Sequence, residues 1–97
     1  MRITLHPGAE RDVAEAAEFY EREASPILAG RFIVEFRRVT RVLQENPGIG
    51  SPRANGRRSF PMQVFPYVLI YRPLDGAIRI LVVRHHRRHP SYGEFRK

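Results

Sequence analysis

The chain has 97 residues, no cysteine and a formal net charge of +7. This length predicts one domain spanning residues 1–97, and the absence of cysteine excludes disulfides, thiolate metal sites and cysteine nucleophiles. No stretch is apolar for long enough to span a bilayer, and the N-terminal residues lack a signal-peptide core. We therefore expect a cytoplasmic protein without a membrane partner.

The positive charge is confined to the second half of the chain. Residues 1–52 contain seven Lys/Arg and eight Asp/Glu, whereas residues 53–97 contain ten Lys/Arg and two Asp/Glu. Such a one-sided basic surface attracts polyanions, including nucleic acids and acidic proteins. The alternative is a solvated basic face that serves only solubility, although solubility does not require this segregation.

The first half of the chain predicts a strand and two helices. Residues 1–7 alternate apolar and polar side chains before Pro7-Gly8. Residues 8–25 are alanine-rich with helical spacing, and we expect Glu10 and Asp12 to lie in the first turn. Ser25-Pro26 predicts the start of a second helix, which ends at residues 46–48. Its apolar stripe steps by three or four residues through Leu28, Phe32, Phe36, Val39 and Leu43.

The second half predicts a loop and then strands. Residues 46–56 are rich in Gly, Pro and Asn. Strand-like segments follow at residues 57–62, 63–72 and 77–86, with a turn at residues 73–76. The expected fold is therefore α+β: an N-terminal strand, a helical hairpin, and a three-stranded antiparallel meander with the hairpin on one face.

Arginines cluster near the ends of these predicted strands, where they can converge into one concave basic patch. Guanidinium groups bind phosphates bidentately and stay charged at any accessible pH. Tyrosines lie among them, and we expect Tyr67 and Tyr71 to pack in the sheet. Tyr92 follows in a polar tail, where a packing role is not expected and stacking on an unpaired base is possible. The arginines are Arg53, Arg57, Arg58, Arg72, Arg84, Arg87 and Arg88.

Three histidines, His85, His86 and His89, follow the last predicted strand. A metal site is disfavoured, because no acid lies nearby and the arginines repel cations, so we expect no metal or cofactor. General acid–base chemistry is the alternative, with the arginines lowering a histidine pKa; a solvated histidine without a role is equally compatible. Histidine, arginine and tyrosine together suit RNA cleavage through the 2′-hydroxyl, which needs a base, an acid and cations.

Four segments, in this order, resemble the RelE/ParE superfamily of toxin–antitoxin toxins. The segments are "ERDVAEAAEFYERE", "RFIVEFRRVTRVLQENPGIGSP", "RRSFPMQVFPYVLIYR" and "IRILVVRHHRRHPSY". The resemblance implies a helical hairpin on a small sheet. It also implies a growth-inhibiting toxin of the plasmid-stabilization type, held inactive by an acidic or amphipathic segment of an antitoxin encoded nearby. We expect that segment to cover the sheet and the basic patch.

The resemblance leaves the target open. RelE-like members cut mRNA in the ribosome without a metal, whereas ParE-like members inhibit DNA gyrase. By motif, the catalytic positions of RNA-cutting members match His86, Arg88, Tyr92 and one of Arg57 and Arg58, of which we assign Arg58 to the catalytic set. The remaining arginines would then bind the target: Arg53, Arg57, Arg72, Arg84 and Arg87. The chain lacks a lysine cluster and a carboxylate base, and "RSFPMQVFPYVLIYR" is closer to the ParE-like side. A non-toxic basic binding module, such as an antitoxin-binding corepressor, is the remaining alternative.

Overall fold

The apolar periodicity of the first half of the chain forms two helices joined by a short turn. The computed structural model describes all 97 residues, with α1 at Pro7–Glu23 and α2 at Pro26–Glu45. His6 caps α1, its Nδ1 accepting a hydrogen bond of 2.8 Å from the Gly8 N–H. The predicted start of the second helix is confirmed, since the Ser25 hydroxyl accepts a bond of 3.1 Å from the Leu28 N–H.

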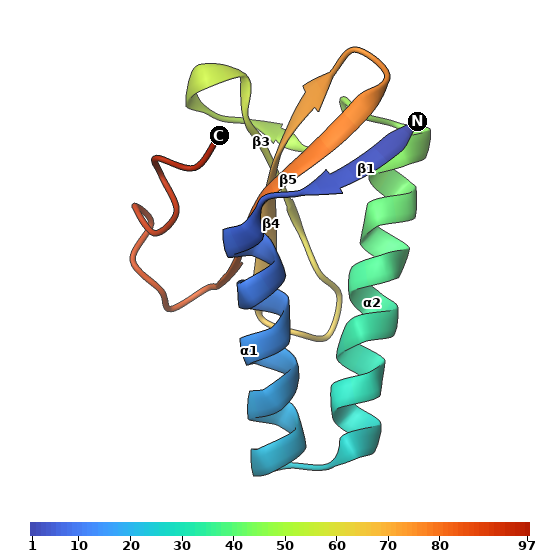
Figure 1. Cartoon of the computed structure of the whole chain (residues 1–97), viewed down its shortest axis with the longest axis vertical. Coiled ribbons are helices and arrows are strands. Elements are labelled where there is room, and N and C mark those ends of the chain that lie inside the picture. Colours follow the sequence, from blue (N-terminus) through green and yellow to red (C-terminus); the bar gives the residue numbers. More distant parts are fainter.

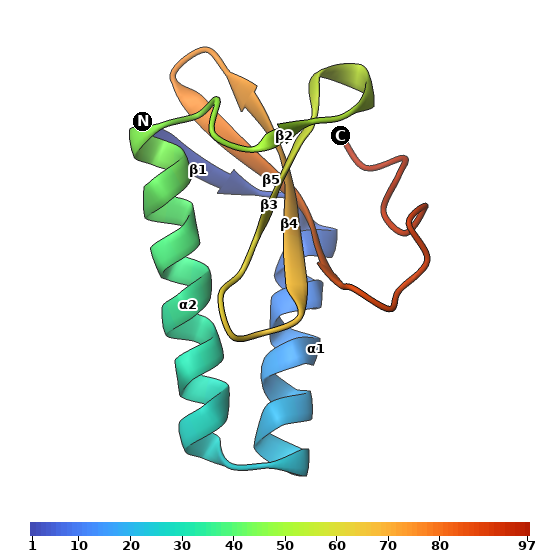
Figure 2. The ribbon, with the colours of Figure 1, turned by 180° about the vertical axis from the view of Figure 1, so that it is seen from behind.

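The strands form one mixed sheet of five, ordered β1-β5-β4-β3-β2 (Figures 1 and 2). β1 is parallel to β5, and the other neighbours are antiparallel. The α+β class and the β3–β4–β5 meander are therefore confirmed, while the short β2 lies in a segment that we expected to be a loop. The strands are β1 at Arg2–Leu5, β2 at Ser51–Pro52, β3 at Arg58–Pro61, β4 at Tyr67–Leu74 and β5 at Ala77–His85.

β4 begins later than its β-branched and aromatic composition predicts. Val64 has a φ of 71°, a conformation that a β-branched residue rarely adopts and that cannot continue a strand. Residues 62–66 instead form a tight connection, closed by a 2.9 Å hydrogen bond from the Met62 N–H to the Tyr67 carbonyl. The prediction of a strand from residue 63 was therefore wrong, and this loop projects beside α2 (Figure 2).

The main core lies between the helical hairpin and one face of the sheet. Phe32 and Leu43 of α2 pack there with Tyr71 of β4 and Ile78 and Ile80 of β5, all of them fully buried. Burying side chains of this size stabilises the fold by about 2 kcal/mol each. The prediction that Tyr67 and Tyr71 pack in the sheet is confirmed. None of the helices is apolar over a length that would cross a membrane.

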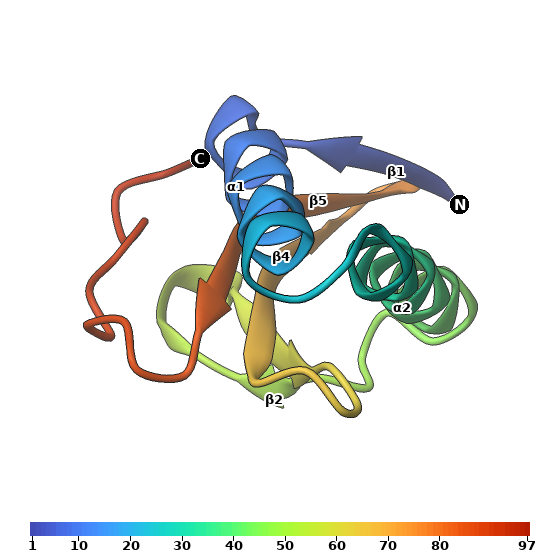
Figure 3. The same ribbon diagram turned by 90° about the horizontal axis from the view of Figure 1, so that it is seen from below.

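The other face of the sheet carries a smaller apolar cluster and the C-terminal tail, defined here as residues 86–97. Ile70, Leu81 and Val82 form this cluster with Tyr92 packed against it. The register changes next to Ile70, leaving Leu81 as an extra residue in β5, so that Leu81 and Val82 both join the cluster. Figure 3 shows the red tail on the side of the sheet away from α2.

Candidate functional site

A buried carboxylate joins the tail to the first helix and the last strand. The Asp12 side chain is 3% exposed and accepts hydrogen bonds from the Val83 N–H at 2.9 Å and from Arg96 Nη1 at 2.6 Å. It also accepts a hydrogen bond from the Tyr92 hydroxyl. The expectation that Asp12 lies in the first helical turn was wrong, because this residue lies deeper in α1, where it is buried.

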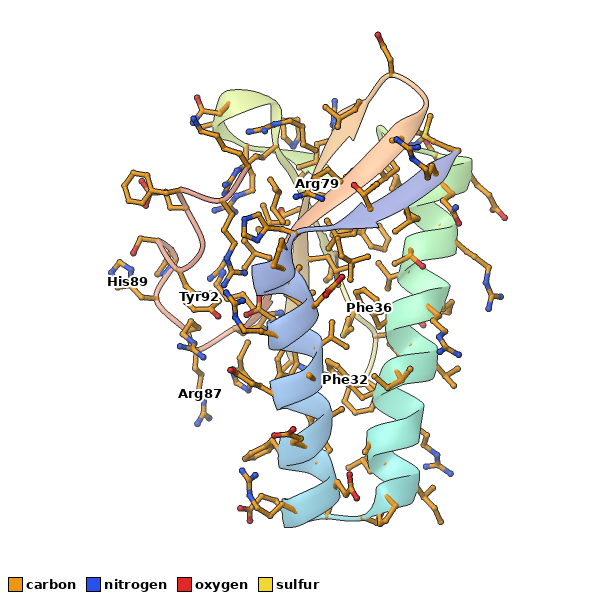
Figure 4. The ribbon with its side chains drawn as sticks, in the orientation of Figure 1. Phe32, Phe36, Arg79, Arg87, His89 and Tyr92 are labelled. Carbon is orange, nitrogen blue, oxygen red and sulfur yellow. The ribbon has the colours of Figure 1, made fainter.

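Tyr92 packs against the protein instead of projecting from a polar tail, so that expectation was also wrong. Its side chain points from the tail toward α1, whereas Arg87 and His89 point away (Figure 4). The guanidinium carbons of Arg88 and Arg96 lie 4.3 Å and 4.8 Å from the centre of its ring. Burial and the hydrogen bond to Asp12 raise the pKa of Tyr92, so the phenol stays protonated.

Two hollows lie on either side of Tyr92 and divide the predicted basic patch. The first, which we call the tail hollow, has a volume of about 380 Å³, and the second about 260 Å³. Arg58, Arg72, His86 and Arg87 line neither hollow. The tail hollow is lined by Arg53, Ala54, Asn55, Arg57, Ile70, Pro90, Tyr92 and Glu94. The second is lined by residues of α1 and by Tyr67, Val83, Arg84, His85, Arg88 and Tyr92.

Three of the predicted site arginines hold backbone segments in place. Arg57 Nη2 donates to three carbonyls of the tail, at 2.6 Å, 2.8 Å and 3.3 Å. Arg58 Nη1 donates to two carbonyls of the loop before β2, at 2.8 Å and 3.2 Å. Arg72 Nε donates to the Asn55 carbonyl at 3.2 Å. Arg57 and Arg72 therefore order segments that line the tail hollow, whereas Arg58 orders the loop before β2.

Two other arginines retain unpaired donors. Arg84 is 9% exposed, and its Nε is buried without a hydrogen-bond partner. Its Nη1 donates only a long bond of 3.4 Å to the Arg88 carbonyl. Burial and then the charge of Arg53 lower the pKa of Arg84. The exposed guanidinium of Arg53 makes neither a hydrogen bond nor an ion pair, and it reaches the tail hollow.

Among the histidines, His85 rather than His86 occupies the arginine-rich environment. The His85 ring packs edge-on against Tyr67 with 5.1 Å between ring centres, and its Nδ1 accepts from the Arg87 N–H at 3.0 Å. Burial lowers the pKa of His85, followed by the charges of Arg87, His86 and Arg88. The exposed His86 side chain makes no hydrogen bond, although its backbone N–H donates to the Pro66 carbonyl.

Asp12 and Arg96 are organising residues that were not predicted from the sequence. The periodicity of α1 contained a signal, because Asp12 shares its apolar stripe with the buried Ala9 and Ala16. An acid on a buried stripe requires a partner. The sequence offered no comparable signal for Arg96, since its contact with Asp12 connects residues from opposite ends of the chain.

Comparison with known proteins reveals a consistent family relationship. The family model described as the ParE toxin of the type II toxin–antitoxin system, parDE, matches residues 3–90. Toxin ParE2 from two strains of Mycobacterium tuberculosis is 30% identical over 90 residues, which cover 93% of this chain and 86% of the relative. A solved structure, the chromosomal ParDE toxin–antitoxin system from P. aeruginosa, shares the fold. It has a TM-score of 0.77 and 22% identity, covering 88% of this chain and 95% of that chain.

The family match ends at Pro90, so Tyr92, Glu94 and Arg96 lie beyond it. The roles of these three side chains therefore come from their contacts in this chain alone. The match covers β1 from its second residue and every later element to the end of β5. The chain thus belongs to the ParE toxins, is the toxin component of a type II toxin–antitoxin system, and has a cognate antitoxin as its protein partner.

Proposed function

We propose that this toxin inhibits growth in the cytoplasm by acting on DNA gyrase rather than by cutting mRNA. The membership in the ParE family supports this target, because the ParE-like side of the superfamily is the one associated with gyrase. Cleavage of mRNA on the ribosome is the competing function. It would use the predicted set of His86, Arg58, Arg88 and Tyr92.

The observation that carries this proposal is the dispersion of that set. His86 and Arg58 line neither hollow, and the Arg58 guanidinium is engaged by carbonyls of the loop before β2. The hydroxyl of Tyr92 donates to Asp12 and is held protonated. General acid–base catalysis needs its groups within hydrogen-bond reach of one reacting phosphate. The arrangement favours binding of a target over chemistry on it.

The test is the order in which macromolecular syntheses stop after the toxin gene is induced alone. We expect thymidine incorporation to fall first, with DNA breaks, while methionine incorporation continues in the first minutes. Purified toxin should also inhibit supercoiling of relaxed plasmid by gyrase. A prompt fall in methionine incorporation with cleaved messages would refute the gyrase proposal and favour mRNA cleavage.

His86→Ala is the informative variant for the competing function. This side chain is exposed and makes no hydrogen bond, so its removal leaves the fold intact. Gyrase inhibition predicts unchanged toxicity, whereas RNA cleavage through this histidine predicts a loss of toxicity. Variants at Arg58 or Tyr92 are less informative, because both side chains also support the structure.

We further propose that the antitoxin binds in an apolar groove beside α2 instead of on the basic patch. This groove, of about 640 Å³, lies between α2 and the loop of residues 62–66. Three apolar residues on it are strongly exposed: Ile27 at 71%, Val34 at 66% and Val64 at 96%. Arg31 also lines the groove and has no acidic partner, whereas Arg38 is paired with Glu35. The occupant that fits this chemistry is an amphipathic antitoxin helix with an acidic edge.

A charge placed in this groove tests the antitoxin surface. Val34→Asp should weaken binding of the cognate antitoxin by about tenfold or more, because an apolar anchor is replaced by an acid that must be desolvated. Leu74→Asp is the matched control, since Leu74 is an exposed apolar residue outside the groove. Equal affinity of both variants, measured by titration calorimetry, would place the antitoxin elsewhere.

A further inference from the structure

The second hollow, which lies between α1, the end of β5 and the start of the tail, is surrounded by hydrogen-bond donors without acceptors. We propose that it binds a carboxylate attached to a small apolar group. Its volume is about 260 Å³, and both neutral and cationic donors reach it. This inference does not depend on gyrase as the target, because it concerns the chemistry of one hollow in the isolated toxin.

The Tyr67 hydroxyl is the first of these donors. Tyr67 is 9% exposed, and its ring packs edge-on against those of Phe32 and His85. The hydroxyl makes no hydrogen bond, yet it is not sealed inside the protein, because Arg84 Nε is the only fully buried side-chain polar atom without a partner. Since Tyr67 lines the second hollow, its hydroxyl opens into that space. Burial raises the pKa of Tyr67, so the phenol keeps the proton that it would donate to a ligand oxygen.

The tautomer of His85 provides a second neutral donor. The His85 Nδ1 accepts the hydrogen bond from the Arg87 N–H at 3.0 Å, so the neutral ring carries its proton on Nε2. Burial lowers the pKa of His85, and the charges of Arg87, His86 and Arg88 lower it further, which keeps the ring neutral near neutral pH. His85 lines the second hollow, and its Nε2–H donates to no atom of the protein. A ligand oxygen can therefore accept this hydrogen bond.

Two arginines of the second hollow supply cationic donors. Arg84 is nine-tenths buried, its Nε has no partner, and its Nη1 makes only the 3.4 Å bond to the Arg88 carbonyl. The guanidinium of Arg88 lies over the Tyr92 ring without a hydrogen bond or an ion pair. Leaving a charged donor unpaired in a protein interior is costly, so such groups usually have a partner. These two side chains favour a ligand with a negative charge.

The balance of charge around the second hollow matches a ligand with one negative charge. The Asp12 carboxylate also lines the hollow, but Arg96 balances it at 2.6 Å. Arg22, on the same lining, forms an ion pair of 3.8 Å with Glu23. The charges that remain unpaired on the lining are two cations and one acid, a net charge of +1: Arg84, Arg88 and Glu15. A carboxylate neutralises this charge, whereas a phosphate dianion exceeds it.

Apolar side chains define the rest of the ligand. Ala16, Phe19 and Val83 line the same hollow, and Phe19 is 46% exposed. The carbon chain next to a bound carboxyl group would pack against them. The volume lies below the roughly 300–1,000 Å³ that is typical of sites for drug-sized ligands. The ligand is therefore one small group, either a free short-chain carboxylic acid or a single acidic side chain beside an apolar residue in a peptide.

The experiment follows the arginine Nε–Hε resonances of the ¹⁵N-labelled toxin during titrations. The probes are isovalerate, its neutral amide isovaleramide, inorganic phosphate, and two acetylated peptide amides with the sequences Leu-Glu-Leu and Leu-Gln-Leu. We expect saturable shifts of the Arg84 and Arg88 resonances with a carboxylate probe, and none with isovaleramide or the Leu-Gln-Leu peptide. Reading Arg84 in the wild-type protein avoids a substitution at a buried position.

Tyr67→Phe tests the neutral donor without disturbing the packing of the ring. It should weaken carboxylate binding by about fivefold, the loss of one hydrogen bond. The fold should be unaffected, because the hydroxyl has no partner in the protein. Tyr20→Phe is the matched control, since its ring lies 6.4 Å from that of Tyr67 but Tyr20 does not line the hollow. This control should bind the carboxylate like the wild-type toxin.

Two charge variants of opposite sign complete the design. Arg88→Gln should weaken binding by about tenfold, the loss of one charge-assisted contact. Arg87→Gln is its control, because Arg87 lines neither hollow and points away from the protein (Figure 4). Glu15→Gln should strengthen binding by about threefold, because a repulsive charge is removed.

The probes also separate the two sources of a carboxylate. Tighter binding of the Leu-Glu-Leu peptide than of isovalerate supports the proposal with an acidic residue of a protein partner as ligand. Saturation by isovalerate alone supports it with a free carboxylic acid as ligand. The proposal is overturned if the Arg84 and Arg88 resonances do not shift, or if a neutral probe or phosphate binds as tightly as the carboxylates. Equal affinities of Tyr67→Phe and Tyr20→Phe would also overturn it.

Discussion

Asp12 is the residue whose environment most strongly couples distant parts of the chain. Its carboxylate satisfies one backbone N–H, one phenol and one guanidinium group, contributed by Val83, Tyr92 and Arg96. Removing the carboxylate leaves all three donors without their acceptor in a largely buried site. Removing one member of a buried ion pair therefore destabilises the fold by more than the whole pair contributes to the free energy of unfolding.

We predict that Asp12→Ala lowers the free energy of unfolding by about 3 kcal/mol, because it removes the ion-pair partner of the largely buried Arg96 and the acceptor of the Val83 N–H. Urea denaturation followed by circular dichroism measures the change. Glu18→Ala is the matched control, since Glu18 is an exposed acid of the same helix, and its effect should stay within about 0.5 kcal/mol. If both substitutions changed the free energy of unfolding equally, Asp12 would not have the organising role described here.

His6 makes stability depend on pH. Burial lowers the pKa of His6 below its ordinary value of 6.5, and the charges of Arg96, Arg79 and Arg11 lower it further. The His6 Nδ1 must stay unprotonated to accept the hydrogen bond from the Gly8 N–H. Below pH 6.5 the unfolded chain binds a proton at His6 that the folded chain resists, so the free energy of unfolding falls as pH falls. His85 contributes in the same direction.

The corresponding prediction is a decrease in unfolding free energy between about pH 7 and about pH 5. His6→Asn keeps a capping acceptor without titrating, so its stability should depend less steeply on pH in this window. Denaturant unfolding at several pH values measures the slope. A slope that is unchanged in His6→Asn would assign the dependence to other groups.

Single residues also show where sequence reasoning reached its limit. The capping role of Ser25 was predictable, because a cap is a contact between neighbours in sequence. The burial of Tyr92 was not, because its partners lie up to 80 residues away and a polar tail contains no periodicity. The candidate catalytic set of His86, Arg58, Arg88 and Tyr92 remains a prediction, to be tested through toxicity.

At the level of elements, the tail acts as a cover for the outer face of the sheet. Gly93 has a φ of 75°, and a Cβ at this position would meet Val82 Cγ2 at 2.5 Å. Arg57, which lies between β2 and β3, donates hydrogen bonds to the carbonyls of Glu94 and Arg96 in the tail. The tail therefore depends on a close approach between its backbone and β5, which only glycine permits.

Gly93→Ala should therefore detach the tail and expose the small apolar cluster around Val82. We expect it to lower the free energy of unfolding by about 2 kcal/mol more than the strain of a positive φ does by itself. Gly56→Ala isolates that strain, because Gly56 has a φ of 71° with no atom near its added Cβ. Hydrogen exchange of the tail amides measures detachment. Protected tail amides in Gly93→Ala would contradict the close packing described above.

Among the elements, both helices and the meander were predictable from local periodicity and turn residues. The parallel pairing of β1 with β5 and the two-residue β2 were not, because each depends on a partner distant in sequence. The late start of β4 has a different origin, since the backbone turns at Val64 within a segment of strand-forming composition. Pairing between strands that are distant in sequence thus accounts for most of the features of the sheet that were not predicted.

At the level of the whole molecule, the charge segregation seen in the sequence becomes a cationic region around the tail. Residues 53–97 carry ten Lys/Arg and two Asp/Glu, and two of these cations, Arg53 and Arg57, line the tail hollow. Like charges held together in the folded state repel one another and oppose folding. Salt that screens these charges therefore favours the folded toxin.

We accordingly predict that raising NaCl from about 50 mM to about 500 mM increases the free energy of unfolding by about 1 kcal/mol. Arg53→Gln should reduce this dependence by removing one of the repelling charges, whereas Arg41→Gln on α2 should change it less. Thermal unfolding across the salt series provides the measurement. A stability that falls with salt would show that attractive ion pairs dominate instead.

The parallel pairing of the first strand with the last has a consequence for synthesis of the toxin. β1 finds its only neighbour in β5, and Asp12 finds Arg96 84 residues further along the chain. A nascent chain from which β5 has not yet emerged can form the helical hairpin but neither the sheet edge nor the contacts of the tail. The helical hairpin therefore forms first during synthesis, and the sheet edge and the contacts of Asp12 with the tail form last.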